Sequence, residues 1–187
     1  MKGDIAYLLW MQNLIMPAGL KATSSPIQVS QFSIELVAGT FVSEAIDLAL
    51  NPLDQEVFVV TQVNLDVDAP DSVLALTTSV DATLSTVLRT TLGDISNSNV
   101  LASARREIIC NSGMTPDGGI PFDREDPTFT ALTEDYLGII ATSNCFLNLQ
   151  GTNNGNVKQA RVRIYGYRAQ ATAPVYAALV QSEVLSA

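Results

Sequence analysis

Carboxylates are the main residues that could do chemistry in this 187-residue chain, because the sequence contains no histidine. Without histidine, neither a Ser-His-Asp or Cys-His nucleophile nor a histidine-containing metal site can form. The acidic residues Asp66, Asp68 and Asp71 lie close together in sequence. Their oxygens could ligate Ca²⁺, which takes about six to eight oxygen ligands, although the spacing matches no EF-hand. The alternative interpretation is that these are ordinary solvated carboxylates near a turn. Calcium is the one cofactor that the sequence suggests.

Four arginines form the local cationic groups of the chain, and they are Arg105, Arg106, Arg161 and Arg163. Binding through nucleic-acid phosphates needs clustered cations. The net charge is −9, and neither end of the chain carries a run of Lys or Arg. We therefore expect no basic arm for nucleic-acid binding. The four arginines are expected to form salt bridges, with contact to nucleic acid or lipid head groups as the alternative.

Other reaction chemistry finds little support in the residues. Cys110 and Cys145 form no CxxC motif and lie in predicted strands, so we expect two buried thiols, with a disulfide as the alternative. Gly118 and Gly119 are followed by Ile-Pro and not by the start of a helix, which excludes a phosphate-binding loop there. We expect no enzymatic activity.

The elements that must position these residues are predicted to be β-strands. From residue 28 to residue 168, apolar and polar residues alternate in short segments divided by turn-forming stretches. The clearest segment runs from Glu56 to Asp68, and one face is expected to carry Val57, Val59, Thr61, Val63, Leu65 and Val67. A half-buried strand is expected where Phe32, Ile34 and Leu36 alternate with Gln31, Ser33 and Glu35.

The last predicted strand covers residues 158–168. Its inward face is expected to hold Ala160, Val162, Ile164 and Gly166, and its outward face Arg161, Arg163, Tyr165 and Tyr167. Residues 111–128 are so rich in Gly, Pro and Asp that we expect a long loop without a regular element. Together these patterns predict an all-β fold, an eight-stranded antiparallel jelly-roll sandwich with short helical or extended N- and C-terminal arms.

Both ends of the chain are apolar. The segment from Ile5 to Met16 is shorter than the roughly 20 residues of a membrane span and is a poor signal peptide. We expect it to dock as a short helix on protein, with a lipid surface as the alternative. The segment after Pro174 is helix-compatible and would expose apolar surface unless it packs on something. The residues expected to make subunit contacts are Leu8, Leu9, Trp10, Ile15, Val175, Tyr176 and Leu179.

These features predict three parts of the chain: an arm and linker at 1–25, with the linker at residues 17–26, a jelly-roll domain at 26–172, and a second arm at 173–187. Charged residues make up 16% of the chain, against about 25% in an ordinary soluble domain. Such a surface is typical of a protein that is largely covered by other subunits. A monomer with a surface rich in Ser, Thr and Asn is the alternative.

Three segments near the C-terminus resemble the last strands of small single jelly-roll viral capsid (coat) proteins. They are Tyr136–Thr142, Cys145–Gly151 and Ala160–Arg168. The resemblance implies a structural protein of the virion, a major capsid protein or one of two coat components, whose copies assemble into an icosahedral shell. In that family the two sheets form the wall of the shell, and loops and terminal arms form the contacts.

The N-terminus departs from one common version of that family. Many such proteins carry a basic N-terminal arm, whereas here the first 25 residues hold only Lys2 and Lys21. The genome would then face a second capsid protein, an internal membrane, or a few wall residues such as Arg161 and Arg163. The competing hypothesis is a β-sandwich carbohydrate-binding or surface-attachment module that uses Tyr165 and Tyr167.

Overall fold

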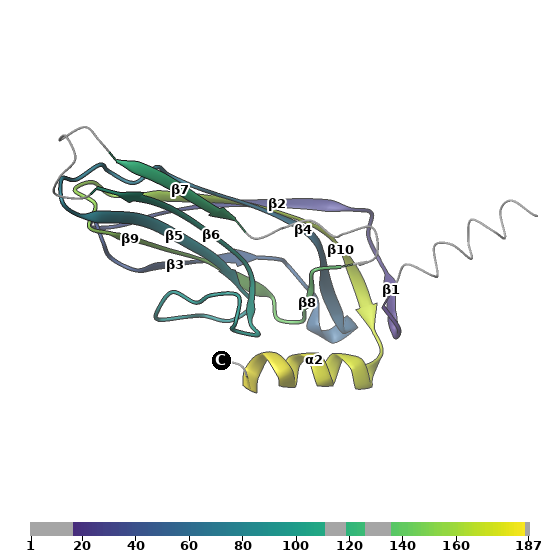
Figure 1. The fold of residues 1–187 in the computed structure, drawn as a ribbon. Helices are drawn as coiled ribbons and strands as arrows, with labels where there is room; N and C mark the ends of the chain where they lie inside the picture. Colours follow the sequence, from purple (N-terminus) through teal and green to yellow (C-terminus); the bar gives the residue numbers. More distant parts are fainter. Residues whose placement is uncertain (1–16, 111–118, 126–135, 186–187) are drawn as a thin grey trace, which may run out of the picture.

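The computed structural model describes residues 17–110, 119–125 and 136–185. Within these ranges the chain forms ten strands, one 3-10 helix and one α-helix (Figure 1). In chain order they are β1 (Leu20–Ala22), β2 (Ile27–Ile34), β3 (Val42–Asp47), η1 (Pro52–Asp54), β4 (Glu56–Val67), β5 (Thr77–Ser85), β6 (Val100–Ile109), β7 (Ile120–Glu125), β8 (Gly138–Ile140), β9 (Asn144–Thr152), β10 (Gln159–Ala171) and α2 (Ala173–Leu185).

The strands form two antiparallel sheets that stack as a sandwich (Figure 1). The first sheet has the order β2-β10-β4-β8, and β1 pairs with the C-terminal end of β10. The second sheet has the order β3-β9-β5-β6-β7. Without β1 and β7, this is the strand order of a jelly roll, with four strands in each sheet. The predicted all-β sandwich is therefore confirmed.

The described residues hold ten strands where the sequence predicted eight. β1 lies in the segment that was expected to be a linker, and it forms because β10 runs past the end of β2 and continues to Ala171. β7 lies in the segment that was expected to be an irregular loop, so that prediction was wrong for residues 120–125. Pro121 is compatible with β7 because an edge strand has one side on which no N–H is needed.

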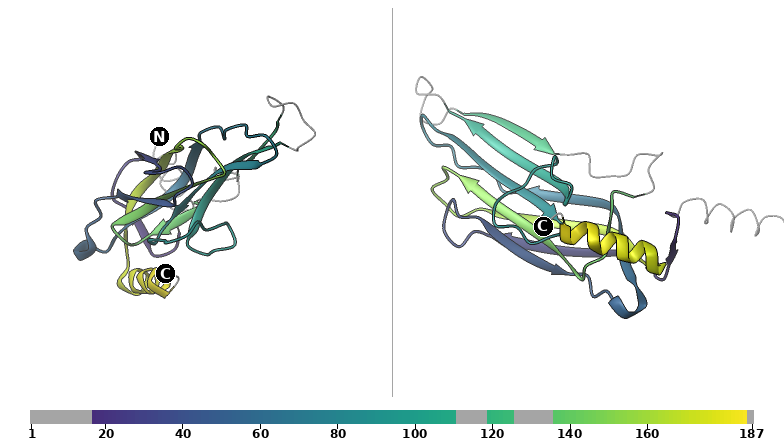
Figure 2. Two further views of the ribbon diagram at one scale, coloured as in Figure 1. Left: turned by 90° about the vertical axis from the view of Figure 1, so that its left-hand side faces the viewer. Right: turned by 90° about the horizontal axis from the view of Figure 1, so that it is seen from below.

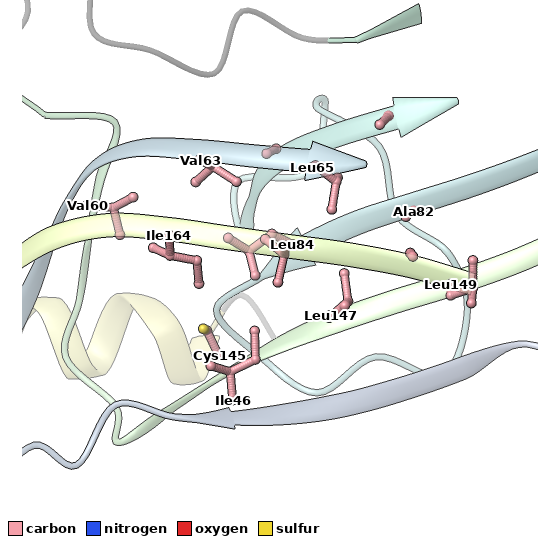
Figure 3. Packing of buried hydrophobic residues seen from close by; sticks show 14 of the residues in the cluster. Ile46, Val60, Val63, Leu65, Ala82, Leu84, Cys145, Leu147, Leu149 and Ile164 are labelled. Carbon is pink, nitrogen blue, oxygen red and sulfur yellow. The ribbon is translucent and has the colours of Figure 1, made fainter. Parts of the chain in front are cut away.

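Apolar side chains from both sheets fill the space between them (Figure 3). β4 and β10 contribute from the first sheet, and β5 and β9 from the second. The labelled residues that meet there include Val60, Val63, Leu65, Leu84, Leu147, Leu149 and Ile164. All of these seven side chains are at most 4% exposed, so the sandwich has a continuous core.

A bulge in β4 overturns the prediction that its odd-numbered residues share one face. Gln62 pairs with Tyr165 and Val60 pairs with Gly166, which leaves Thr61 as an extra residue. The extra residue reverses the alternation, as β-bulges do. Phe58 and Val60 consequently lie in the main core, whereas Val57 and Val59 face the opposite side of the sheet.

α2 covers that opposite side, next to β1 and the ends of β4 and β10 (Figures 1 and 2). Its residues Val175, Tyr176, Leu179 and Val180 pack on a second apolar cluster. The buried members of that cluster are Val57, Val59, Ala141, Ala169 and Ala171. The C-terminal segment thus buries apolar surface within its own chain. In the described part of the chain, no helix is both long enough and apolar enough to cross a membrane.

β2 faces the opposite way from the expected one. Ser33 and Glu35 are buried, whereas Phe32 is 60% exposed and Leu36 is 86% exposed. The Glu35 carboxylate explains this orientation, because it accepts hydrogen bonds from the backbone N–H groups of Gly39 (3.2 Å), Gly151 (2.6 Å) and Lys158 (2.9 Å). These bonds satisfy an inward-facing carboxylate and leave Phe32 and Ile34 outside, whereas Ile27 and Val29 at the start of β2 pack against the core.

Candidate functional site

The acidic residues proposed for calcium make separate polar contacts in the structure. Asp66 lies 3.4 Å from an Arg106 nitrogen and 3.7 Å from an Arg161 nitrogen. Asp68 lies 3.1 Å from Arg161. Both carboxylates thus form ion pairs with arginine side chains. Across the described ranges, no group of three or more Asp, Glu, Cys or His side chains is placed to hold a metal ion.

Asp71 fixes two loops to each other. Its carboxylate lies 2.7 Å from Lys158 Nζ and accepts hydrogen bonds from the backbone N–H groups of Gly155 (2.9 Å) and Asn156 (3.0 Å). Burial raises the pKa of Asp71, but the hydrogen bonds from Lys158 and Asn156 and the charge of Lys158 outweigh that effect, so the pKa lies below its ordinary value. This carboxylate therefore holds the β4–β5 loop against the β9–β10 loop.

Salt bridges account for three of the four arginines that the sequence singled out. Arg105 pairs with Asp81 (3.3 Å) and Glu107 (3.2 Å). Arg106 joins the two sheets, because it pairs with Asp66 of β4 and with Asp123 of β7 (3.4 Å each) and donates to the Val67 carbonyl. Arg161 pairs with Asp66 and Asp68.

Arg163 differs from the other three arginines. Its guanidinium donates to the Tyr165 hydroxyl at 3.5 Å, and no carboxylate of the described residues pairs with it. It borders an open groove of about 490 Å³ on the outer face of the first sheet, which is lined by Ser30, Gln31, Phe32, Asn64, Asp66, Arg161, Val162 and Arg163. The groove offers hydrogen-bonding groups, the guanidinium of Arg163 and the exposed ring of Phe32, so it is suited to binding.

The tyrosines of the carbohydrate hypothesis lie on one face of β10, as expected, but both are only partly exposed. Tyr165 is half-buried beside Arg163, whereas Tyr167 packs with the second apolar cluster beneath α2. A sugar-binding platform of two tyrosines is therefore absent from β10, although both side chains were correctly expected to leave the main core.

Both cysteines are buried thiols, as predicted. Burial is the main cause that raises the pKa of Cys145 to about 12, and the nearby Glu183 carboxylate adds to it. A thiol with such a pKa is inert, because the thiolate is the reactive form.

Glu183 is the one charged residue of α2 that lies buried. Its carboxylate accepts hydrogen bonds from the backbone N–H groups of Ala141 (2.8 Å) and Thr142 (3.0 Å). Burial raises the pKa of Glu183 above its ordinary value, although these hydrogen bonds oppose the shift. Glu183 thus attaches the helix to the turn between β8 and β9, a contact that the sequence pattern did not predict.

Apolar side chains on the outside are the feature that the sequence pattern missed most clearly. β2 and the residues after it expose Phe32, Ile34, Leu36 and Val37. Other exposed positions are Leu88 after β5, Ile120 and Phe122 of β7, and Val184 and Leu185 at the end of α2. An open groove of about 310 Å³ lies between Leu88, Phe146 and Val184.

The predicted subunit contacts divide into two groups. Leu8, Leu9, Trp10 and Ile15 lie outside the described residues. Val175, Tyr176 and Leu179 pack against the second apolar cluster of their own chain. Their assignment to subunit contacts stays a prediction, whereas Val184 and Leu185 are the exposed apolar residues of α2.

Comparisons with known proteins found no matching family model and no matching curated protein. Among solved structures, the chain is similar to one of Desmodium yellow mottle tymovirus, at 11% identity and a TM-score of 0.28, with 84% of this chain and 93% of that chain covered. A structure of Turnip yellow mosaic virus matches at 7% identity and a TM-score of 0.27, with 80% and 95% covered. The tailspike protein gp49 of Acinetobacter baumannii bacteriophage Fri1, a capsular polysaccharide depolymerase, matches at 15% identity and a TM-score of 0.16, with 87% and 23% covered. These scores are too low to support a functional argument.

Proposed function

We propose that the chain is a structural subunit whose copies assemble into the icosahedral shell of a virus, as the major capsid protein or as one of two coat components of the virion. The observation that carries this proposal is a jelly-roll sandwich with large apolar side chains on its outside. Phe32, Leu36, Leu88 and Phe122 are each more than half exposed. Phe32, Ile34 and Leu36 lie along β2 and its continuation, and a large exposed apolar patch marks an interaction site.

The use of charge in the fold supports the same proposal. Three arginines, Arg105, Arg106 and Arg161, bind carboxylates of their own chain. These ion pairs hold loops and sheets together, and charged residues are only 16% of the chain. A surface of this composition is stabilised when copies cover it.

The partners that follow from this proposal are copies of the same chain. Because the sequence has no basic arm and its wall arginines are mostly paired, direct contact with the genome would fall to a second capsid protein, an internal membrane or Arg163. Ca²⁺ is not needed to hold Asp66, Asp68 and Asp71 in place, since protein cations and N–H groups already contact them.

Electron microscopy and sedimentation velocity of the purified chain test the proposed function. We expect closed particles, or pentamers and hexamers that convert to particles at higher concentration. A stable monomer over a range of protein concentration, pH and salt would contradict the proposal. A catalytically silent monomer that binds glycans would favour the competing carbohydrate-binding function.

A further inference from the structure

The edges of the two sheets are protected unequally. Soluble proteins prevent edge-to-edge pairing with short strands, charged side chains, Pro and bulges. In the second sheet, β3 carries Glu44 and Asp47, and β7 carries Pro121 and Asp123. In the first sheet, β8 has three residues, and where β4 extends beyond β8 it holds Asp66 and the bulge at Thr61.

β2 has none of these protective features. Its eight residues, IQVSQFSI, include no charged residue and no Pro. It pairs with β10 from Ile27 to Ile34 without a shift in register, and among the described strands it pairs with no other. The nearest acidic residue, Glu35, is 2% exposed and is engaged by three backbone N–H groups. In the part of the chain that the structure describes, one regular and uncharged edge of the sandwich therefore has no neighbouring strand.

The outward side chains of this edge are apolar toward its C-terminal end. Phe32 is 60% exposed and Ile34 is 37% exposed, and Leu36 beyond the strand is 86% exposed. Arg161, which pairs with Phe32 in the sheet, binds Asp66 and Asp68. Arg163, which pairs with Ser30, is the neighbouring cation that has no carboxylate partner among the described residues. The edge thus combines unpaired backbone groups with an apolar face, and an added strand satisfies both.

We propose that β2 is an assembly edge, on which β2 of a second copy pairs antiparallel about a two-fold axis near Phe32. The inference rests on the proposed function and adds a specific contact to it. A copy is the partner that fits, because two uncharged strands meet without like-charge repulsion although each chain has a net charge of −9. The axis sets Phe32 beside Phe32 of the partner subunit, and aromatic side chains opposite each other stabilise antiparallel pairs.

A charge-swap experiment tests this geometry. Phe32→Glu and Phe32→Lys are prepared separately and mixed, with Leu53→Glu and Leu53→Lys as matched controls, because Leu53 is 91% exposed on η1. We expect each Phe32 variant alone to self-associate at least about tenfold more weakly than the wild type, as like charges then face each other at the axis. The mixture should recover association, and the Leu53 variants should behave like the wild type in sedimentation velocity.

A cysteine variant provides a second readout that does not depend on weakened assembly. Phe32→Cys should form a disulfide-linked dimer under mild oxidation, whereas Leu53→Cys should not, because Leu53 lies on η1 and not on the proposed contact. The native Cys110 and Cys145 are buried and should not contribute to cross-linking. Circular dichroism and thermal unfolding establish that each variant is folded.

The outcomes separate this inference from the proposed function. Particles that still form from Phe32→Glu, or a mixture that recovers nothing, overturn the β2 contact and leave the shell function standing. Wild-type dimers that respond to the charge swap but never form a shell overturn the shell function and support the β2 contact. Failure of Phe32→Cys to cross-link in a wild-type-like particle also overturns the contact.

Discussion

Gly166 lies where β10 passes the bulge in β4, and a larger side chain has no room there. A Cβ atom at this position would overlap the Val59 carbonyl oxygen and would lie 2.6 Å from the Phe58 ring. The absence of a side chain lets the two longest strands bend together and places Val59 beneath α2. The close approach of the two strands at this glycine thus allows β4 to contribute side chains both to the main core and to the second apolar cluster.

Replacement of this glycine should destabilise the whole fold. We expect Gly166→Ala to lower the free energy of unfolding by about 3 kcal/mol, since overpacking forces backbone to move. Gly155→Ala is the matched control, because its Cβ would meet only the Asp71 carboxylate at 3.8 Å, and we expect it to change stability by less than about 0.5 kcal/mol. Denaturant unfolding measures both, and equal stabilities of the two variants would contradict the role given to Gly166.

At the scale of the elements, α2 depends on one buried carboxylate and a small apolar cluster. Glu183 accepts hydrogen bonds from the N–H groups of Ala141 and Thr142 while Val175, Tyr176 and Leu179 pack on β4 and β10. Since burial raises the pKa of Glu183, the folded chain binds a proton at this residue more readily than the unfolded chain does. The stabilising contribution of Glu183 is therefore fully present at low pH and decreases as the pH rises through its folded pKa.

Acidification should strengthen the docking of α2 through this residue. As the pH falls from neutral toward the ordinary value of 4.5, the stability of the wild type should rise relative to that of Glu183→Gln, which has no titrating group there. Chemical unfolding of both proteins at each pH gives the difference, and hydrogen exchange at Ala141 and Thr142 locates it. A difference that does not depend on pH would show that Glu183 keeps its ordinary pKa.

Sequence periodicity identified most of the strands, because alternation is a local property, but it did not identify which way each strand faces. The bulge at Thr61 reversed β4, and three backbone hydrogen bonds to Glu35 turned β2 around. The strands β1 and β7 were missed because distant partners, β10 and β6, decide whether these short segments pair.

The candidate site shows the same limit. Sequence reasoning assigned the arginines to salt bridges, which holds for Arg105, Arg106 and Arg161, because an excess of carboxylates makes such pairs easy to form. It could not assign individual partners such as Asp66 of β4 and Asp123 of β7, since these meet only when the two sheets stack. The exposure of Phe32 could not be predicted either, because the orientation of β2 depends on contacts of Glu35 with residues far away in the sequence.

At the scale of the whole molecule, self-assembly must act against charge. Each copy has a net charge of −9, whereas the proposed contact at β2 is uncharged and apolar. Long-range repulsion between copies is screened by salt, but burial of apolar surface is not weakened by it. Under the proposed function, the balance between charge repulsion and apolar burial decides when shells form.

Salt should therefore promote assembly. Between about 0.01 M and 1 M salt the Debye length falls from about 30 Å to about 3 Å, so we expect association of the wild type to increase over this range. Static light scattering at fixed protein concentration measures it. Association that weakens with added salt would indicate that ion pairs between copies hold the shell together, contrary to the apolar contact proposed here.

The pairing of β2 with β10 also determines when a newly made chain becomes competent to assemble. β2 comes early in the sequence, yet its strand partner begins at Gln159, so a ribosome must complete most of the polypeptide before the edge exists. Chains that end before β10 lack the strand with which β2 pairs. Under the proposed shell function, defective copies are thereby kept out of a growing particle by the order in which the fold is completed.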